Sequence, residues 1–198
     1  NRAMKSMDIA LMRLDPSLVA EIVGRDPDEG QQLDGVPEWY IGPMLKDVIM
    51  HEVGHTLGLR HNFKASGIYD LSELHSAEMS DQAIAGSVME YLPVNINMED
   101  GKEQGPFGMT TLGPYDYWAI EYGYGFDDPK EVAKRGADPM LAYATDEDTF
   151  GPDPMARRFD NGKNPLDYAE SQMRLVTALR AELLDRMIDD GESWTKAR

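Results

Sequence analysis

Three of the four histidines of this 198-residue chain stand within eleven residues, and this clustering restricts the fold more than any other feature. The stretch reads His-Glu-Val-Gly-His-Thr-Leu-Gly-Leu-Arg-His and contains His51, His55 and His61. It lies at the end of a helical pattern that we expect over residues 37–59. A helix turns by about 100° per residue, so His51 and His55 lie on one face, about 40° apart. Two imidazoles so placed can bind one metal ion.

The residues between these histidines indicate a catalytic type of site. Gly58 permits the left-handed turn that ends the helix, after which the chain delivers His61 as a third ligand. Glu52 lies about 80° from the mean direction of the first two imidazoles, where its carboxylate can take a proton from a bound water. Three neutral nitrogens leave one position open for that water, which is typical of catalytic Zn²⁺. The alternative is that the three histidines stand at a helix end without binding a metal.

Charge and composition narrow the class of partner. The chain has 36 acidic and 19 basic residues, for a formal charge of −17. Nucleic acids and anionic membranes need clustered positive charge, so we expect neither as the main partner. Cysteine is absent, which excludes disulfides, zinc ribbons and thiol catalysis. No apolar run approaches the ~20 residues of a membrane span, so we expect no membrane span.

Helical patterns predominate along the chain, and strand patterns are weak. Besides residues 37–59, we expect helices over 1–14, 15–22, 71–85, 113–123, 129–135 and from 164 to about 189. A strand-like fragment covers 93–96, and 136–164 is expected to be a loop. The last helix is expected to bury one face made by Ala169, Met173, Val176, Ala178, Leu179, Leu183, Met187 and Ile188. The sequence therefore predicts a mainly α fold.

The eleven-residue motif matches the zinc signature of the metzincins, and the chain resembles that clan of metalloproteases. Metzincins carry a methionine turn after the zinc motif, and Ser-Val-Met-Glu-Tyr at residues 87–91 resembles it. The resemblance makes Met89 an apolar floor below the three imidazoles, although it is also acceptable as an ordinary core methionine. In the astacin and serralysin branches, a tyrosine two residues further reaches the zinc or the oxyanion. The resemblance extends that role to Tyr91, whose alternative is packing under the turn.

The sequence around this turn and the segment Leu-Gly-Pro-Tyr-Asp-Tyr-Trp resemble one branch of the metzincins, the large bacterial metalloproteases called Met-zincins. The resemblance covers residues 40–125 with specific motifs and the remainder loosely, and Glu90 departs from the histidine or aspartate of several other branches. Met-zincins are generally exported, multidomain proteins. The resemblance thus implies a peptide or protein substrate, the remaining domains of a parent protein as partners, and an extracytoplasmic location (periplasmic, outer-membrane-associated or secreted).

Metzincins also place a twisted sheet before the zinc helix, whereas the 50 residues before His51 are expected to form helix and loop. We therefore expect one domain of a longer protein, with a zinc-site helix, a helical C-terminal subdomain and little sheet. Its expected parts are a lead-in at 1–40, a core with zinc helix and Met-turn at 41–125, and an acidic loop with a long helix at 126–198.

Three functions stay open at this point. The first is a zinc-dependent endopeptidase in which Glu52 is the general base for a metal-activated water and Tyr91 stabilises the oxyanion. The second is a zinc-binding but non-catalytic interaction module of a larger protein. The third is a metalloenzyme that acts on a substrate other than a peptide.

We expect the other polar and aromatic clusters to have structural rather than functional roles. His75 lies in a polar helical stretch and is expected to be solvated rather than a fourth ligand. The acidic residues of 146–162 fit no EF-hand spacing, so a solvated loop is preferred to a calcium site. A group of aromatic residues at helical spacing is preferred as core over a substrate groove: Tyr115, Tyr117, Trp118, Tyr122 and Tyr124.

Overall fold

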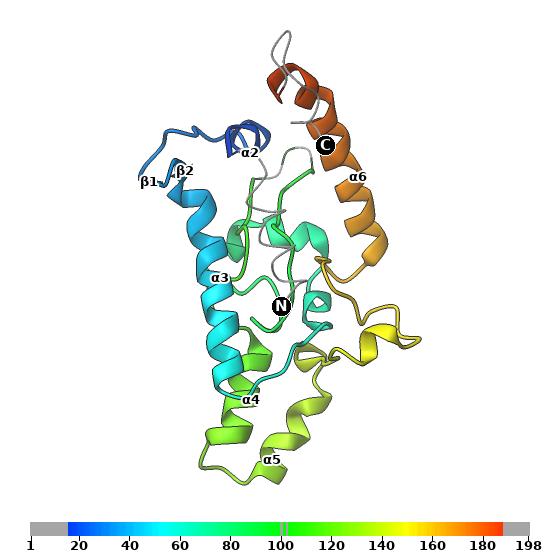
Figure 1. Ribbon diagram of the computed structural model, residues 1–198. Coiled ribbons are helices and arrows are strands. Elements are labelled where there is room, and N and C mark those ends of the chain that lie inside the picture. The colour runs from blue at the N-terminus through cyan, green and yellow to red at the C-terminus, as the bar shows by residue number, and fades with distance from the viewer. Residues whose placement is uncertain (1–15, 100, 102, 188–198) are drawn as a thin grey trace.

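The computed structural model describes residues 16–99, 101 and 103–187, and this part of the chain is mainly helical (Figure 1). Its α-helices are α2 (Pro16–Ile22), α3 (Glu38–Thr56), α4 (Pro114–Tyr124), α5 (Pro129–Lys134) and α6 (Pro165–Met187). Short 3₁₀ helices are η1 (Ala65–Ile68), η2 (Leu71–His75), η3 (Ala77–Met79), η4 (Arg135–Ala137), η5 (Pro139–Leu141) and η6 (Asp148–Phe150). The predicted mainly α fold is confirmed. The helix expected over 1–14 lies outside the described residues.

A two-stranded hairpin stands directly before α3, and the sequence analysis missed it. Strands β1 (Gln32–Leu33) and β2 (Val36–Pro37) pair antiparallel. The two residues between them, Asp34 and Gly35, have φ angles of 53° and 81°. An Asp-Gly pair favours the type I′ turn of such a hairpin, so this dipeptide was the available signal.

The strand expected over residues 93–96 is wrong. Val94 and Ile96 are buried, as in a strand, but the segment is irregular. Its backbone contact to a neighbouring segment runs from the N–H of Asn95 to the carbonyl of Phe107 at 2.9 Å. Asn95 is buried as well, so the segment lacks the alternating burial of a half-exposed strand.

Two apolar clusters hold the described elements together. One surrounds Met89 and packs the segment after α3 against the partly buried Met50 and Leu59. The other joins Val19 of α2 and Tyr40 of α3 to Leu175 of α6 and to the irregular chain between these helices. In Figure 1, α3 and α6 lie along opposite sides of that irregular chain. The zinc-motif helix is therefore fixed at both of its ends by packed side chains.

Helix α6 forms as expected, but the predicted buried face is wrong in part. Met173 is 65% exposed and Val176 is 48% exposed, whereas Leu175 is buried. Leu175 shares its face with the partly buried Ala178 and Leu179, which were predicted correctly. Apolar residues occupy more than one side of this helix, so spacing alone did not identify the packed side.

The aromatic residues of α4 divide between core and surface. Tyr115 is partly buried and stacks on Tyr143, and the indole N–H of Trp118 donates to the carbonyl of Val132 at 2.9 Å. The expectation of core packing is wrong for the exposed Tyr117, Tyr122 and Tyr124.

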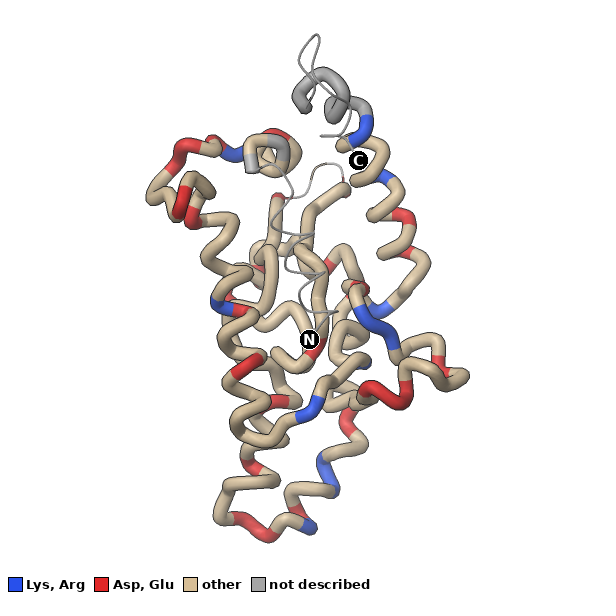
Figure 2. Tube along the Cα trace, in the orientation of Figure 1, with Lys and Arg blue, Asp and Glu red and all other residues tan. Residues whose placement is uncertain are grey.

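Charged residues are spread along the described chain, and acidic positions outnumber basic ones in Figure 2. No helix in the described residues combines the length and the apolar character that crossing a membrane requires.

Candidate metal centre

The end of α3 has the geometry that the motif predicts. The helix ends at Thr56, and Gly58 follows in the left-handed region with a φ of 84°. The N–H of Leu59 donates to the carbonyl of Gly54 at 3.1 Å, five residues back along the turn. The N–H of Gly58 donates to the carbonyl of His55 at 3.0 Å. These two bonds form a Schellman motif, which turns the chain back toward the helix that it has just left.

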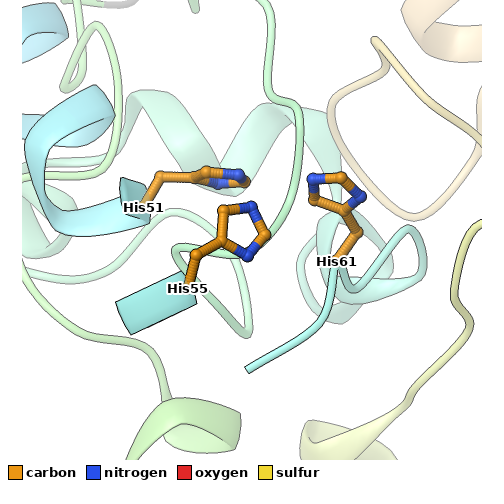
Figure 3. A group of neighbouring side chains, drawn as sticks. All are labelled: His51, His55 and His61. Atoms are coloured by element: carbon orange, nitrogen blue, oxygen red, sulfur yellow. The ribbon is translucent and has the colours of Figure 1, made fainter. Parts of the chain in front are cut away.

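This turn brings His61 beside His51 and His55 (Figure 3). One ligand atom from each histidine lies within 4.8 Å of the other two. The ring centroids are 4.7 Å apart for His51 and His55, 4.8 Å for His55 and His61, and 5.4 Å for His51 and His61. Within the described residues, this is the group of histidine and acidic side chains that is arranged to hold a metal ion.

Each of the two helical histidines is held by a backbone carbonyl. Nδ1 of His51 lies 2.7 Å from the carbonyl oxygen of Val88, and Nδ1 of His55 lies 2.9 Å from that of Leu59. A carbonyl oxygen only accepts hydrogen bonds, so Nδ1 carries the proton in both rings. The lone pair of each neutral imidazole is therefore on Nε2, and that nitrogen is the one available to a metal.

The environment of His51 fits a metal ligand. Its side chain is 5% exposed, and its Nε2 is buried without a hydrogen-bond partner in the described structure. Burial, together with a smaller effect of the neighbouring imidazoles, lowers the pKa of His51 to about 4. The ring is therefore neutral at pH 7, with an unused lone pair, which is the state in which histidine binds Zn²⁺.

Met89, to which the resemblance assigns the floor of the site, is packed against the helix that carries His51 and His55. Its side chain is fully buried and packs against α3 at Gly54. A Cβ atom added to Gly54 would lie 2.3 Å from Sδ of Met89, so only glycine admits the methionine at this distance. The glycine between the two helical histidines therefore has a packing function that the sequence analysis did not identify.

A buried carboxyl group from α4 holds the methionine turn. Asp116 accepts hydrogen bonds from the hydroxyl of Ser87 at 2.5 Å and from the N–H of Val88 at 2.9 Å. The carbonyl of Val88 is the group that orients His51. Burial raises the pKa of Asp116, and its hydrogen-bond donors oppose that shift. Asp116 thus supports His51 through the turn, although it lies far from the zinc motif in the sequence.

Glu90, the departure from other metzincin branches, is a buried anchor. Its carboxyl group accepts the N–H groups of Ala65, Ser66 and Tyr91 at 3.1, 3.3 and 3.0 Å. Burial and the nearby Asp160 raise its pKa well above the usual range. The side chain ties the methionine turn to the segment that follows His61.

Tyr91 contacts the three-histidine group, and Glu52 lies beside it on α3. The hydroxyl of Tyr91 is 2.8 Å from Nε2 of His61, so the phenol reaches the metal-facing nitrogen. Glu52 is exposed next to His51 on α3, and its negative charge acts on the pKa of that histidine.

The acidic loop contributes a residue that sequence reasoning missed. Asp146 accepts a hydrogen bond from Nδ1 of His61 at 2.8 Å. Other acids in this region pair with basic side chains, since Glu147 binds Arg60. The expectation of a solvated loop is therefore wrong for Asp146, and also for Asp160, which is buried.

The expectation for His75 is wrong. It was expected to be solvated, but its side chain is 5% exposed, and Nδ1 accepts the N–H of Gly105 at 3.2 Å. Its polar neighbours in sequence concealed a buried position in a 3₁₀ helix. It is not part of the three-histidine group.

A glycine-ended helix, three anchored histidines and a buried methionine packed against that helix together match a metzincin-type site. Residues 34–198 match the family model described as Met-zincin, so the chain belongs to the Met-zincin family, a metzincin-type family of zinc metalloproteases. No curated protein and no solved structure gives a match.

Proposed function

We propose that this chain is the catalytic zinc module of an endopeptidase. The observation that carries the proposal is the state of the three imidazoles. Each Nδ1 is held by an acceptor, so the lone pair of each imidazole is on Nε2; that of His61 contacts the hydroxyl of Tyr91, and that of His51 is buried with no partner. Such an arrangement would hold Zn²⁺ through His51, His55 and His61.

The residues around the histidines support peptide-bond hydrolysis. When bound, Zn²⁺ would polarise the scissile carbonyl and lower the pKa of water. Glu52 takes a proton from the attacking water, whose oxygen bonds to the carbonyl carbon, and then gives that proton to the amine as the C–N bond breaks. The phenol of Tyr91 donates a hydrogen bond to the oxyanion that develops on the carbonyl oxygen.

Replacement of Glu52 separates metal binding from turnover. In Glu52→Ala, the ligand set is intact, so zinc content measured by atomic absorption should equal that of the wild type. Cleavage of casein or a fluorogenic peptide should fall by on the order of 10²–10⁴-fold, the usual contribution of a general base. Glu38→Ala removes another exposed carboxylate from the same helix and should leave both quantities unchanged. Equal activity in wild type and Glu52→Ala would end the assignment.

A non-catalytic interaction module is the second candidate, and the outer side of α3 favours it. Ile49 and Val53 are exposed on this helix, as is Leu57 just after its end, although clustered apolar residues usually lie against a partner. The same observation supports the remaining domains of a parent protein as the partner of this side. Assays on the present chain and on a version extended upstream distinguish the candidates. A zinc-loaded, upstream-extended protein without peptidase activity would favour the interaction module.

The extracytoplasmic location belongs to this proposal and rests on the family resemblance alone. Fractionation of cells that produce the full-length parent protein tests it, because an exported protein is recovered outside the cytoplasmic fraction. Recovery only with cytoplasmic markers would reject it.

A further inference from the structure

The third histidine differs from the first two in the group that holds it. Backbone carbonyls orient His51 and His55, and both carbonyls belong to segments that pack against α3. The ring of His61 is oriented by a side chain instead, the carboxylate of Asp146. This carboxylate comes from the loop after α5, 85 residues further along the chain.

Asp146 is itself held by a second contact. Its other oxygen accepts a hydrogen bond from the guanidinium of Arg158 at 3.0 Å. That guanidinium lies over the ring of Phe63, 4.7 Å from its centroid. The ring of Phe63 is in turn 5.0 Å from that of His61. The four side chains therefore form a closed circuit of contacts that begins and ends at the third histidine.

The loop backbone around Asp146 is also fixed. The hydroxyl of Thr149 donates to the carbonyl of Asp146 at 2.8 Å, and the N–H of Thr145 donates to the carboxylate of Asp148 at 2.8 Å. Side-chain exposure is 18% for His61 and 39% for Asp146, so water competes only partly for their hydrogen bond. A carboxylate in this position holds a histidine in one tautomer and makes its other nitrogen a stronger ligand.

We infer that Asp146 is a positioning residue that fixes the ring of His61 and thereby sets the zinc affinity of the site. The inference rests on the proposed zinc site. Arg158 holds the carboxylate in line with Nδ1, and Asp146 acts on the metal only through the imidazole. The acidic loop is thus part of the metal centre rather than a solvated connection.

Zinc affinity of the 198-residue chain, measured by competition with a chromophoric chelator, tests the inference. Outer-shell partners of this kind typically contribute about 10–100-fold to metal affinity, so Asp146→Ala should weaken zinc binding by that factor. Asp146→Asn should lose less, because its amide oxygen still accepts a hydrogen bond from Nδ1. Glu147→Gln is the matched control, since Glu147 is the next residue of the loop and pairs with Arg60 at the surface. It should bind zinc as the wild type does.

A double substitution separates positioning from general support of the fold. If Asp146 acts through the imidazole, then Asp146→Ala should have no further effect on the weaker zinc binding of a His61→Ala chain. An equal loss in both backgrounds would overturn the inference, as would wild-type affinity in Asp146→Ala. A wild-type chain that binds no zinc would instead reject the proposed function itself.

Discussion

The two sides of α3 lie in opposite environments, although both carry apolar residues. The packed side includes His51, Gly54 and Asp47, which contact the methionine turn and the chain that follows it. On the other side, Ile49 is 62% exposed and Val53 is 50% exposed. A helix that is apolar all round is usually covered all round. The difference indicates that the effect of a substitution here depends on the side of the helix and not on the residue type.

The largest expected effect comes from a buried acid on the packed side. Asp47 accepts the N–H of Met109 at 3.0 Å, and burial raises its pKa to about 7. Between pH about 4 and 7 the folded chain therefore keeps a proton that the unfolded chain has lost. Stability is lost as pH rises through this window, by up to about 1.4 kcal/mol per pH unit.

Asp47→Asn removes this group, so its unfolding free energy should lack that slope and exceed the wild-type value above pH 7. Urea denaturation at a series of pH values measures it, and Asp81→Asn, at an exposed position, is the control. Parallel pH profiles for wild type and Asp47→Asn would contradict the assignment of the buried proton.

A smaller effect on the unfolding free energy is expected at Gly54, the glycine on the packed side of α3. In Gly54→Ala, the new methyl group overlaps Sδ of Met89, and such overpacking costs about 1–3 kcal/mol of unfolding free energy. Gly123→Ala is the matched control, because Gly123 lies in α4 with nothing within 4 Å of an added Cβ. Alanine should stabilise that helix by up to about 1 kcal/mol. Thermal or urea unfolding of both variants compares them, and destabilisation of equal size would show that the contact with Met89 is unimportant.

The smallest effect is expected on the exposed side. Val53→Gln replaces an exposed apolar side chain and should change the unfolding free energy of this chain by less than about 0.5 kcal/mol. A loss above about 1 kcal/mol would mean that the chain itself covers this side of the helix. The same substitution in an upstream-extended protein sharpens the comparison, because a larger loss there identifies the added segment as the cover.

The parts of the site that the sequence predicted depend on local spacing. His51, His55 and Gly58 are fixed within one helix and its terminal turn, where backbone geometry relates sequence distance directly to direction. Met89 was found through a recognised pattern and not through physical spacing. Its fit against Gly54 follows from packing between two segments, which no single pattern expresses.

The supporting carboxyl groups were not predictable in this way. Asp116 and Asp146 reach the site from segments that are 28 and 85 residues away from their partners. Acidic residues are abundant in this chain, so no local signal separates a buried anchor from a solvated side chain. The same limit explains His75 and the packed face of α6, where burial is decided by neighbours distant in sequence.

The separation between His61 and Asp146 also affects the order in which the centre is assembled. Ribosomes add about 5–20 residues per second, so the carboxylate is synthesised about 4–17 s after the imidazole that it orients. All three imidazole rings of the candidate metal centre therefore exist on the nascent chain before the residue that orients the third one has been made. Locking of that ring is consequently a late event in biosynthesis, completed only when the loop after α5 has emerged and folded back.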